Sequence, residues 1–104
     1  MGVFAGTTAW YVEGVKLKRV QIVTSDYTIT STDGTILADG TLTLTLPTAV
    51  GIVGTKYFIK NIGDGTVTIV GTAGQTIDGD INLILNQKNS SLSLSSDGSG
   101  WLIF

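Results

Sequence analysis

Thr41-Leu42-Thr43-Leu44-Thr45-Leu46 is the stretch that decides the fold. Leucine and threonine alternate strictly, so an extended chain carries three leucines on one face and three threonines on the other. A period of two predicts a β-strand with one face in the core, whereas a helix would need a period of 3.6. Residues 66–70 and 91–95 repeat the pattern. The chain is therefore expected to be all-β.

Asp-Gly pairs separate the alternating segments. They stand at Asp33-Gly34, Asp39-Gly40, Asp64-Gly65, Asp78-Gly79 and Asp97-Gly98. Asp-Gly favours the tight turns that join antiparallel strands, because both residues tolerate positive φ. The pairs therefore predict turns between antiparallel strands, including a hairpin in which residues 57–61 and 66–70 flank a turn at 62–65.

The expected strands follow one another every eight to twelve residues, a spacing typical of a sandwich or small barrel. They cover residues 15–23, 27–30, 35–38, 41–46, 57–61, 66–70, 75–77, 81–85, 91–95 and 101–104. A slip in the alternation near Arg19 and Val20 predicts a β-bulge. We predict one antiparallel β-sandwich, jelly-roll-like, of about eight to ten short strands over residues 15–104. Residues 1–14 are expected to be an N-terminal attachment or interface segment.

The composition excludes several classes of function. Among 104 residues there is no cysteine and no histidine, which removes thiolate metal sites, thiol nucleophiles and the commonest general base. Six basic and eight acidic residues give a net charge of -2, which argues against nucleic-acid binding. No stretch approaches the roughly eighteen apolar residues of a membrane span. We expect neither catalytic residues nor a cofactor.

Asp78, Asp80 and Asn82 have the spacing of oxygen ligands in a calcium-binding loop. The full calcium-loop pattern is absent, and no glutamate follows. A polar turn between strands explains the same residues. We therefore predict a turn here and no metal site.

Four aromatic residues are candidates for an interface or for ligand contact: Trp10, Tyr11, Tyr57 and Trp101. Trp10 and Tyr11 precede the first strand, where an exposed pair could stack on a sugar or dock on a partner subunit. Trp101 lies in the last strand and is expected in the core or in an interface.

Lys16, Lys18 and Arg19 form a basic cluster on the first expected strand. Lysines on an edge strand guard against unwanted pairing with other strands. A binding patch for polyanions is the alternative. We favour the edge strand.

The stretch from Ser25 to Phe104 resembles a β-structured domain that recurs in bacteriophage virion appendages: tail fibres, baseplates and head fibres. The resemblance depends on short motifs in a fixed order, each of which is little more than strand and turn chemistry. They are residues 26–29 (DYTI), 33–37 (DGTIL), 44–49 (LTLPTA), 54–61 (GTKYFIKN), 67–69 (VTI), 75–79 (QTIDG), 94–98 (LSSDG) and 101–103 (WLI). Residues 1–23 lie outside it.

The resemblance implies a non-enzymatic structural module of a virion, made in the host bacterial cytoplasm. Such a module associates with copies of itself, most often as a trimer, and with other virion proteins. It serves assembly or host attachment in a tail fibre, a baseplate or a head decoration. The alternative is a carbohydrate-binding module for a host surface glycan, for which Trp10, Tyr11 and Tyr57 would supply rings. The loop amides of Asn61, Asn82, Asn86 and Asn89 would then supply polar contacts.

Overall fold

The alternating segments form strands in the computed structural model, which describes residues 18–104. The strands are β1 (Arg19–Val23), β2 (Tyr27–Thr28), β3 (Asp33–Ala38), β4 (Leu42–Thr45), β5 (Lys56–Asn61), β6 (Val67–Val70), β7 (Asn82–Leu85), β8 (Ser91–Ser96) and β9 (Trp101–Ile103). A short 3-10 turn, η1 (Thr72–Gly74), follows β6. At residues 75–77, where a strand was expected, only isolated bridges at Ile77 occur. The expected segment at residues 1–14 lies outside the described residues.

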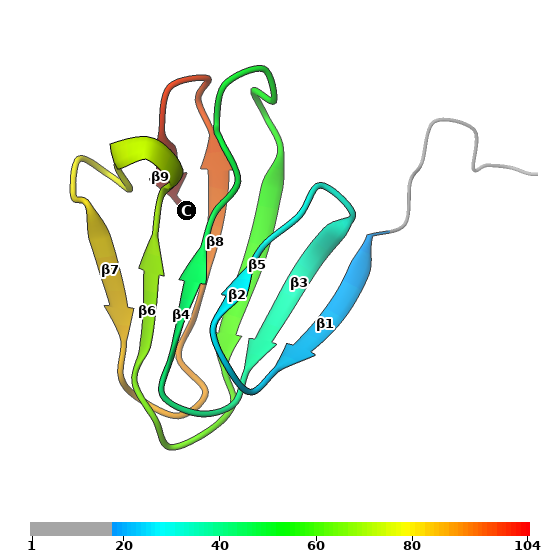
Figure 1. Cartoon of the computed structure of the whole chain (residues 1–104), viewed down its shortest axis with the longest axis vertical. Coiled ribbons are helices and arrows are strands. Elements are labelled where there is room, and N and C mark those ends of the chain that lie inside the picture. The colour runs from blue at the N-terminus through cyan, green and yellow to red at the C-terminus, as the bar shows by residue number, and fades with distance from the viewer. Residues whose placement is uncertain (1–17) are drawn as a thin grey trace, which may run out of the picture.

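The strands build two mixed sheets (Figure 1). One sheet has five strands in the order β1-β3-β5-β8-β9, and the other has four in the order β2-β4-β6-β7. From β1 to β6 the chain alternates between the sheets, and each strand pairs in parallel with the strand two places along. The pairs β5–β8, β6–β7 and β8–β9 are antiparallel. The first part of the domain is thus a coil of parallel strands, completed by antiparallel ones.

The predicted antiparallel pairing is therefore wrong for the four pairs formed among the first six strands and correct for β5–β8, β6–β7 and β8–β9, and the pairing does not show a jelly-roll-like arrangement. The expected hairpin at residues 57–70 does not form, because β5 and β6 belong to different sheets. The alternation assigned the faces of these strands but contained no information about their partners. The predicted bulge is confirmed, since the β1–β3 register shifts between Arg19 and Val20.

The Asp-Gly pairs occupy several kinds of site. Asp39-Gly40 and Asp64-Gly65 lie in the turns that carry the chain from one sheet to the other. Asp97-Gly98 joins the antiparallel strands β8 and β9, as predicted. At Asp78-Gly79 both residues have positive φ, 49° and 88°, as a type I′ turn requires. Asp33-Gly34 lies within β3, so Asp33 is not the turn residue we expected.

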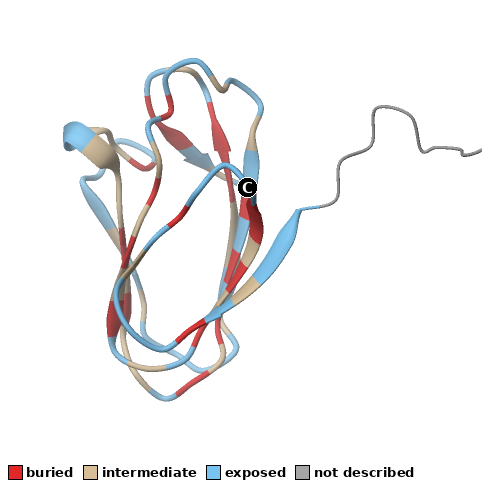
Figure 2. Ribbon diagram, turned by 45° about the vertical axis from the view of Figure 1, so that its right-hand side comes forward, coloured by how far each residue is buried: buried red, intermediate tan, exposed pale blue. Residues whose placement is uncertain are grey.

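The apolar core lies between the two sheets (Figure 2). Leu42 and Leu44 of β4 are paired with Val67 and Ile69 of β6, and all four are buried. Ile36, Ile59 and the partly buried Leu92 form the matching row in the five-stranded sheet. The register places apolar side chains side by side from strand to strand, and the rows of the two sheets pack against each other as the core.

Candidate interaction surface

The outer face of the five-stranded sheet carries exposed apolar side chains. Val20 and Ile22 of β1 are 60% and 64% exposed, Phe58 of β5 is 52% exposed, and Phe104 after β9 is 72% exposed. The outward positions alternate with buried ones in β5, where Tyr57, Ile59 and Asn61 face the core. Scattered exposed apolar residues are ordinary, but several on one sheet face make that face a candidate contact surface.

The register arranges these side chains in rows across the strands. Val20 pairs with Thr35, Thr35 with Phe58, and Phe58 with Ser93. The next row runs from Ile22 through Leu37 and Lys60 to Ser91. Residues that pair across strands point to the same side of the sheet, so each row forms a continuous strip on the surface.

The outer face of the four-stranded sheet has a different character. Its central strands place Thr43 and Thr45 of β4 and Thr68 of β6 outward, all half-buried. Only Ile84 of β7 is a large exposed apolar side chain within the strands of this sheet. Threonine hydroxyls remain hydrated while their methyl groups pack, so exposure of this face to solvent costs little free energy.

β1 is the edge strand predicted for the basic cluster. Arg19 reaches from its start to the carboxylate of Asp33, with Nε and Nη2 at 3.0 and 2.9 Å from Oδ1. Lys18 donates from Nζ to the carbonyl of Ser31 at 2.9 Å. Arg19 therefore ties β1 to the first residue of β3, and Lys18 ties the start of β1 to the turn that precedes β3. Lys16 lies outside the described residues.

The Asp33 carboxylate is fully buried and accepts further hydrogen bonds on Oδ2. The Tyr27 hydroxyl donates at 2.7 Å, and the Thr30 backbone N–H and hydroxyl donate at 3.0 and 3.2 Å. Burial by itself raises the pKa of Asp33, but the hydrogen bonds from Tyr27, Thr30 and Arg19 outweigh it and hold the pKa below its ordinary value. The group is thus an ionised anchor that joins β1, β2 and β3.

The four aromatic candidates do not meet on one surface. Tyr57 and Trp101 are each 1% exposed, and their ring centroids lie 5.6 Å apart in the core. The Tyr57 hydroxyl donates to the carbonyl of Thr30 at 3.1 Å, whereas Trp101 Nε1 has no partner within residues 18–104. These rings pack between the sheets, where neither a ligand nor a second subunit reaches them. Trp10 and Tyr11 lie outside the described residues.

The asparagines proposed for glycan contact are also dispersed. Asn61 is buried at the end of β5, where its Nδ2 donates to the carbonyls of Gly65 and Leu85 at 2.9 and 3.0 Å. Its Oδ1 accepts the N–H of Gly63 at 3.1 Å. This amide therefore stabilises the turn between β5 and β6. Asn82, Asn86 and Asn89 are exposed along β7 and the turn after it.

The Asp78-Gly79-Asp80 segment forms a turn, with Asp78 Oδ1 accepting the N–H of Ile103 at 3.1 Å. Within residues 18–104, no three acidic, histidine or cysteine side chains gather where they could hold a metal ion. No helix in this same range is long and apolar enough to cross a membrane.

The exposed residues of the five-stranded sheet were missing from the sequence prediction, although the sequence contained a signal for Phe58. Lys56 and Lys60 stand two residues on either side of it, and positions two apart share a face. Because lysines at both positions indicate the solvent face, Phe58 had to be outward and Tyr57 inward. Nothing comparable marks Phe104.

Comparison with known proteins adds no relative. No protein-family model matches the chain, and no curated protein sequence matches it.

Proposed function

We propose that the chain is a non-enzymatic, β-sandwich structural module of a bacteriophage virion appendage that associates with copies of itself as a homotrimer. The observation that supports self-association is the open edge of the five-stranded sheet. There β1 presents Val20 and Ile22, both more than half exposed, beside a backbone edge to which no strand of residues 18–104 is paired.

An open edge strand is the part of a sheet most ready to pair with another chain. Of the other three edge strands, β9 has three residues, β2 has two and β7 has four, so each offers less backbone to pair than β1. β1 has five residues, and its guards, Lys18 and Arg19, stand only at its start. A net charge of -2 leaves little repulsion between copies.

The hydrogen bonds of the acidic side chains support a structural role rather than a catalytic one. Asp26 accepts the N–H of Thr43, and Asp97 accepts the N–H groups of Ser99 and Gly100. Asp33 accepts hydrogen bonds from Tyr27 and Thr30, and Asp78 accepts one from the N–H of Ile103. A general acid or base needs a carboxylate aimed at a substrate, whereas these carboxylates hold turns and strand ends in place.

Light scattering on a gel-filtration column tests this proposal with the full chain. We expect about three times the chain mass of 10.9 kDa. Ile22→Lys places a charge on the exposed face of β1, and we expect it to give the monomer mass. Ile84→Lys is the matched control, because Ile84 is 53% exposed on the other sheet. A monomeric wild-type chain, or a trimer that Ile22→Lys leaves intact, would refute association through β1.

A further inference from the structure

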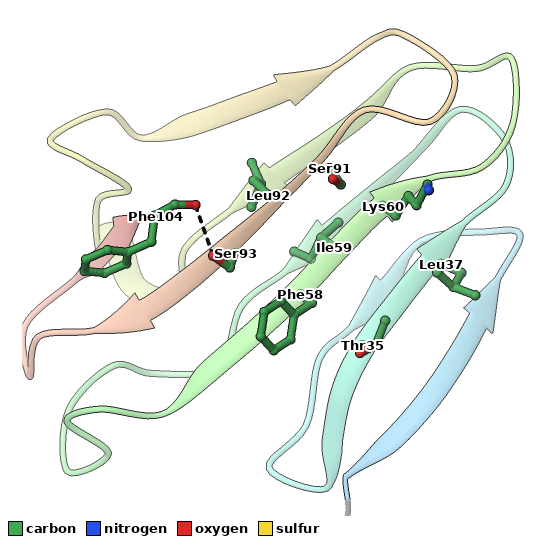
Figure 3. A pocket seen from close by; sticks show the side chains of 9 residues that line it. All are labelled: Thr35, Leu37, Phe58, Ile59, Lys60, Ser91, Leu92, Ser93 and Phe104. Carbon is green, nitrogen blue, oxygen red and sulfur yellow. Dashed lines mark hydrogen bonds between the residues drawn. The ribbon is translucent and has the colours of Figure 1, made fainter.

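A slot opens between two phenyl rings on the outer face of the five-stranded sheet. Ser93 of β8 pairs with Phe58 of β5 on one side. On the other side, Phe104 donates its N–H to the carbonyl of Ser93 at 2.9 Å, which continues the β8–β9 ladder. Figure 3 shows Ser93 between the two rings.

The dimensions follow from strand spacing. Neighbouring strands lie about 4.8 Å apart, so the stems of Phe58 and Phe104 stand roughly 10 Å apart across the small Ser93 side chain. The resulting hollow has a volume of about 400 Å³ and extends over Ser91, Leu37 and Thr35. Ligand sites typically occupy about 300–1,000 Å³, so this hollow accepts one small ring.

The polar groups of the slot are hydroxyls and a cation. Ser93 Oγ donates to a main-chain carboxylate oxygen of Phe104, the last residue of the chain, at 3.0 Å, which leaves the lone pairs of Ser93 Oγ free to accept. Lys60 is paired with Ser91 and stands at the end of the slot. Lys56 places Nζ 4.9 Å from the centre of the Phe104 ring, which steadies that wall. No carboxylate side chain lines the hollow; Lys60 is the charged side chain at one end, and the main-chain carboxylate of Phe104 lies beside Ser93, away from Lys60 (Figure 3).

We propose that this slot binds one sugar-acid unit of an extracellular glycan. The apolar C–H face of a sugar ring packs on a phenyl face, its hydroxyls bond to serine and threonine hydroxyls, and its carboxylate pairs with the Lys60 ammonium. The slot is open along the sheet face, so the rest of a glycan chain extends into solvent. In this proposal Phe58 and Phe104, and not Trp10, Tyr11 and Tyr57, are the rings that contact the sugar. Binding at this site does not depend on self-association.

The charge of the slot favours this ligand over a second copy of the chain. Lysine is depleted in the buried centres of protein interfaces, because desolvating an unpaired ammonium is costly. A second copy that packed the same hollow against this one would offer Lys60 no carboxylate side chain to pair with, because none lines the hollow. An anionic ligand pairs with Lys60 instead.

The test is an NMR titration of the isotope-labelled full chain with two acidic probes and one neutral probe. 3′-Sialyllactose and a galacturonate trisaccharide are the acidic probes, and lactose is the neutral one. We expect at least one acidic probe to shift the amide signals of Ser91, Ser93 and Phe104, with at least tenfold weaker binding of lactose. Ser93→Leu fills the slot and should abolish the shifts. Thr68→Leu makes the same kind of change on the other sheet and should leave them unchanged.

Lys60→Gln tests the contribution of the Lys60 charge, because it removes the ammonium group and keeps a polar side chain of similar length. We expect it to weaken binding of the acidic probe about tenfold while lactose is unaffected, because one charge-assisted hydrogen bond is lost. Absence of shifts with both acids, shifts elsewhere on the chain, or equal binding of lactose would overturn the proposal. Shifts of the slot residues that depend on protein concentration alone would assign the slot to a second copy. Light scattering on the same samples reports self-association separately, so either proposal can fail without the other.

Discussion

Asp33 is buried, whereas the other six aspartates of the chain are exposed. Asp33→Asn keeps the shape but removes the charge that Arg19, Tyr27 and Thr30 all approach as donors. We expect a loss of about 2–3 kcal/mol in the free energy of unfolding, measured by urea denaturation. Asp64→Asn changes an exposed aspartate and should cost less than about 0.5 kcal/mol. Equal effects of the two variants would contradict an anchoring role for Asp33.

The lowered pKa of Asp33 predicts a loss of stability in acid. The folded state binds fewer protons than the unfolded state, in which aspartates have a pKa of about 3.9. The contribution of Asp33 is therefore fully present well above pH 4 and disappears as the pH falls through the folded pKa. Urea denaturation from pH 7 to pH 3 should show a steeper loss for the wild-type chain than for Asp33→Asn. Some loss should remain in the variant, because backbone N–H groups of Ser99 and Gly100 also lower the pKa of Asp97. Parallel curves would show that Asp33 does not contribute.

The sequence identified Asp33 as part of an Asp-Gly pair, but it did not predict that the Asp33 side chain is buried. Asp-Gly is a common turn dipeptide, so the pair at 33–34 looked like the other four. The burial of Asp33 depends on Arg19 and Tyr27, which come from two strands in different sheets. The local sequence pattern contains no information about contacts between residues of different sheets. The bulge at Arg19 was predictable because it interrupts the alternation within a single strand.

At the scale of elements, the connections between the sheets stack on one another. The turn after β5 lies against the turn after β3, where Ile62 donates its N–H to the carbonyl of Ala38 at 2.8 Å and Thr66 donates its N–H to Thr41 Oγ1 at 3.2 Å. A Cβ added at Gly65 would collide with the backbone of Gly40 and Thr41. Glycine is thus required there by close approach of two chain segments.

Gly65→Ala should therefore destabilise the domain more than an ordinary turn substitution. Backbone atoms cannot rotate away, so we expect a loss of at least about 2 kcal/mol in the free energy of unfolding. Gly74→Ala is the control, because Gly74 has a φ of 75° but no atom within 4 Å of an added Cβ. It should cost about 1 kcal/mol, from backbone conformation alone. Thermal denaturation of both variants measures the difference, and a Gly65→Ala variant no less stable than Gly74→Ala would contradict the stacked turns.

The parallel pairing was hidden from the sequence for a related reason. Parallel strands usually have both faces covered and show continuous apolar runs, whereas here each sheet has one open face and its strands alternate. The coils are also unequal in length: Thr35 pairs with Val20, 15 residues before it, and with Phe58, 23 residues after it. No fixed repeat therefore reveals the coil. Face and strand position could be read from the pattern, but strand partners could not.

At the scale of the whole molecule, one core joins both sheets, so the domain should unfold in a single transition. Trp101 is buried between Tyr57 and the rest of this core, and its fluorescence reports packing. In the Trp10→Phe variant it is the sole tryptophan. We expect its fluorescence and the far-UV circular dichroism of the sheets to give the same urea midpoint. Separate midpoints would mean that the parallel coil and the antiparallel strands unfold independently.

Self-association would couple stability to protein concentration. If the trimer dissociates when the chain unfolds, each tenfold rise in concentration stabilises a subunit by about 1 kcal/mol, through mass action. For a domain of this size that raises Tm by about 4–8 °C. We expect the rise in calorimetry of the wild-type chain and of Ile84→Lys, whereas Ile22→Lys should show a constant Tm, because it removes the contact along β1. A constant Tm in the wild-type chain would show that the exposed apolar residues of β1 are not covered by a second copy, and that the open edge of the five-stranded sheet is available to a different protein.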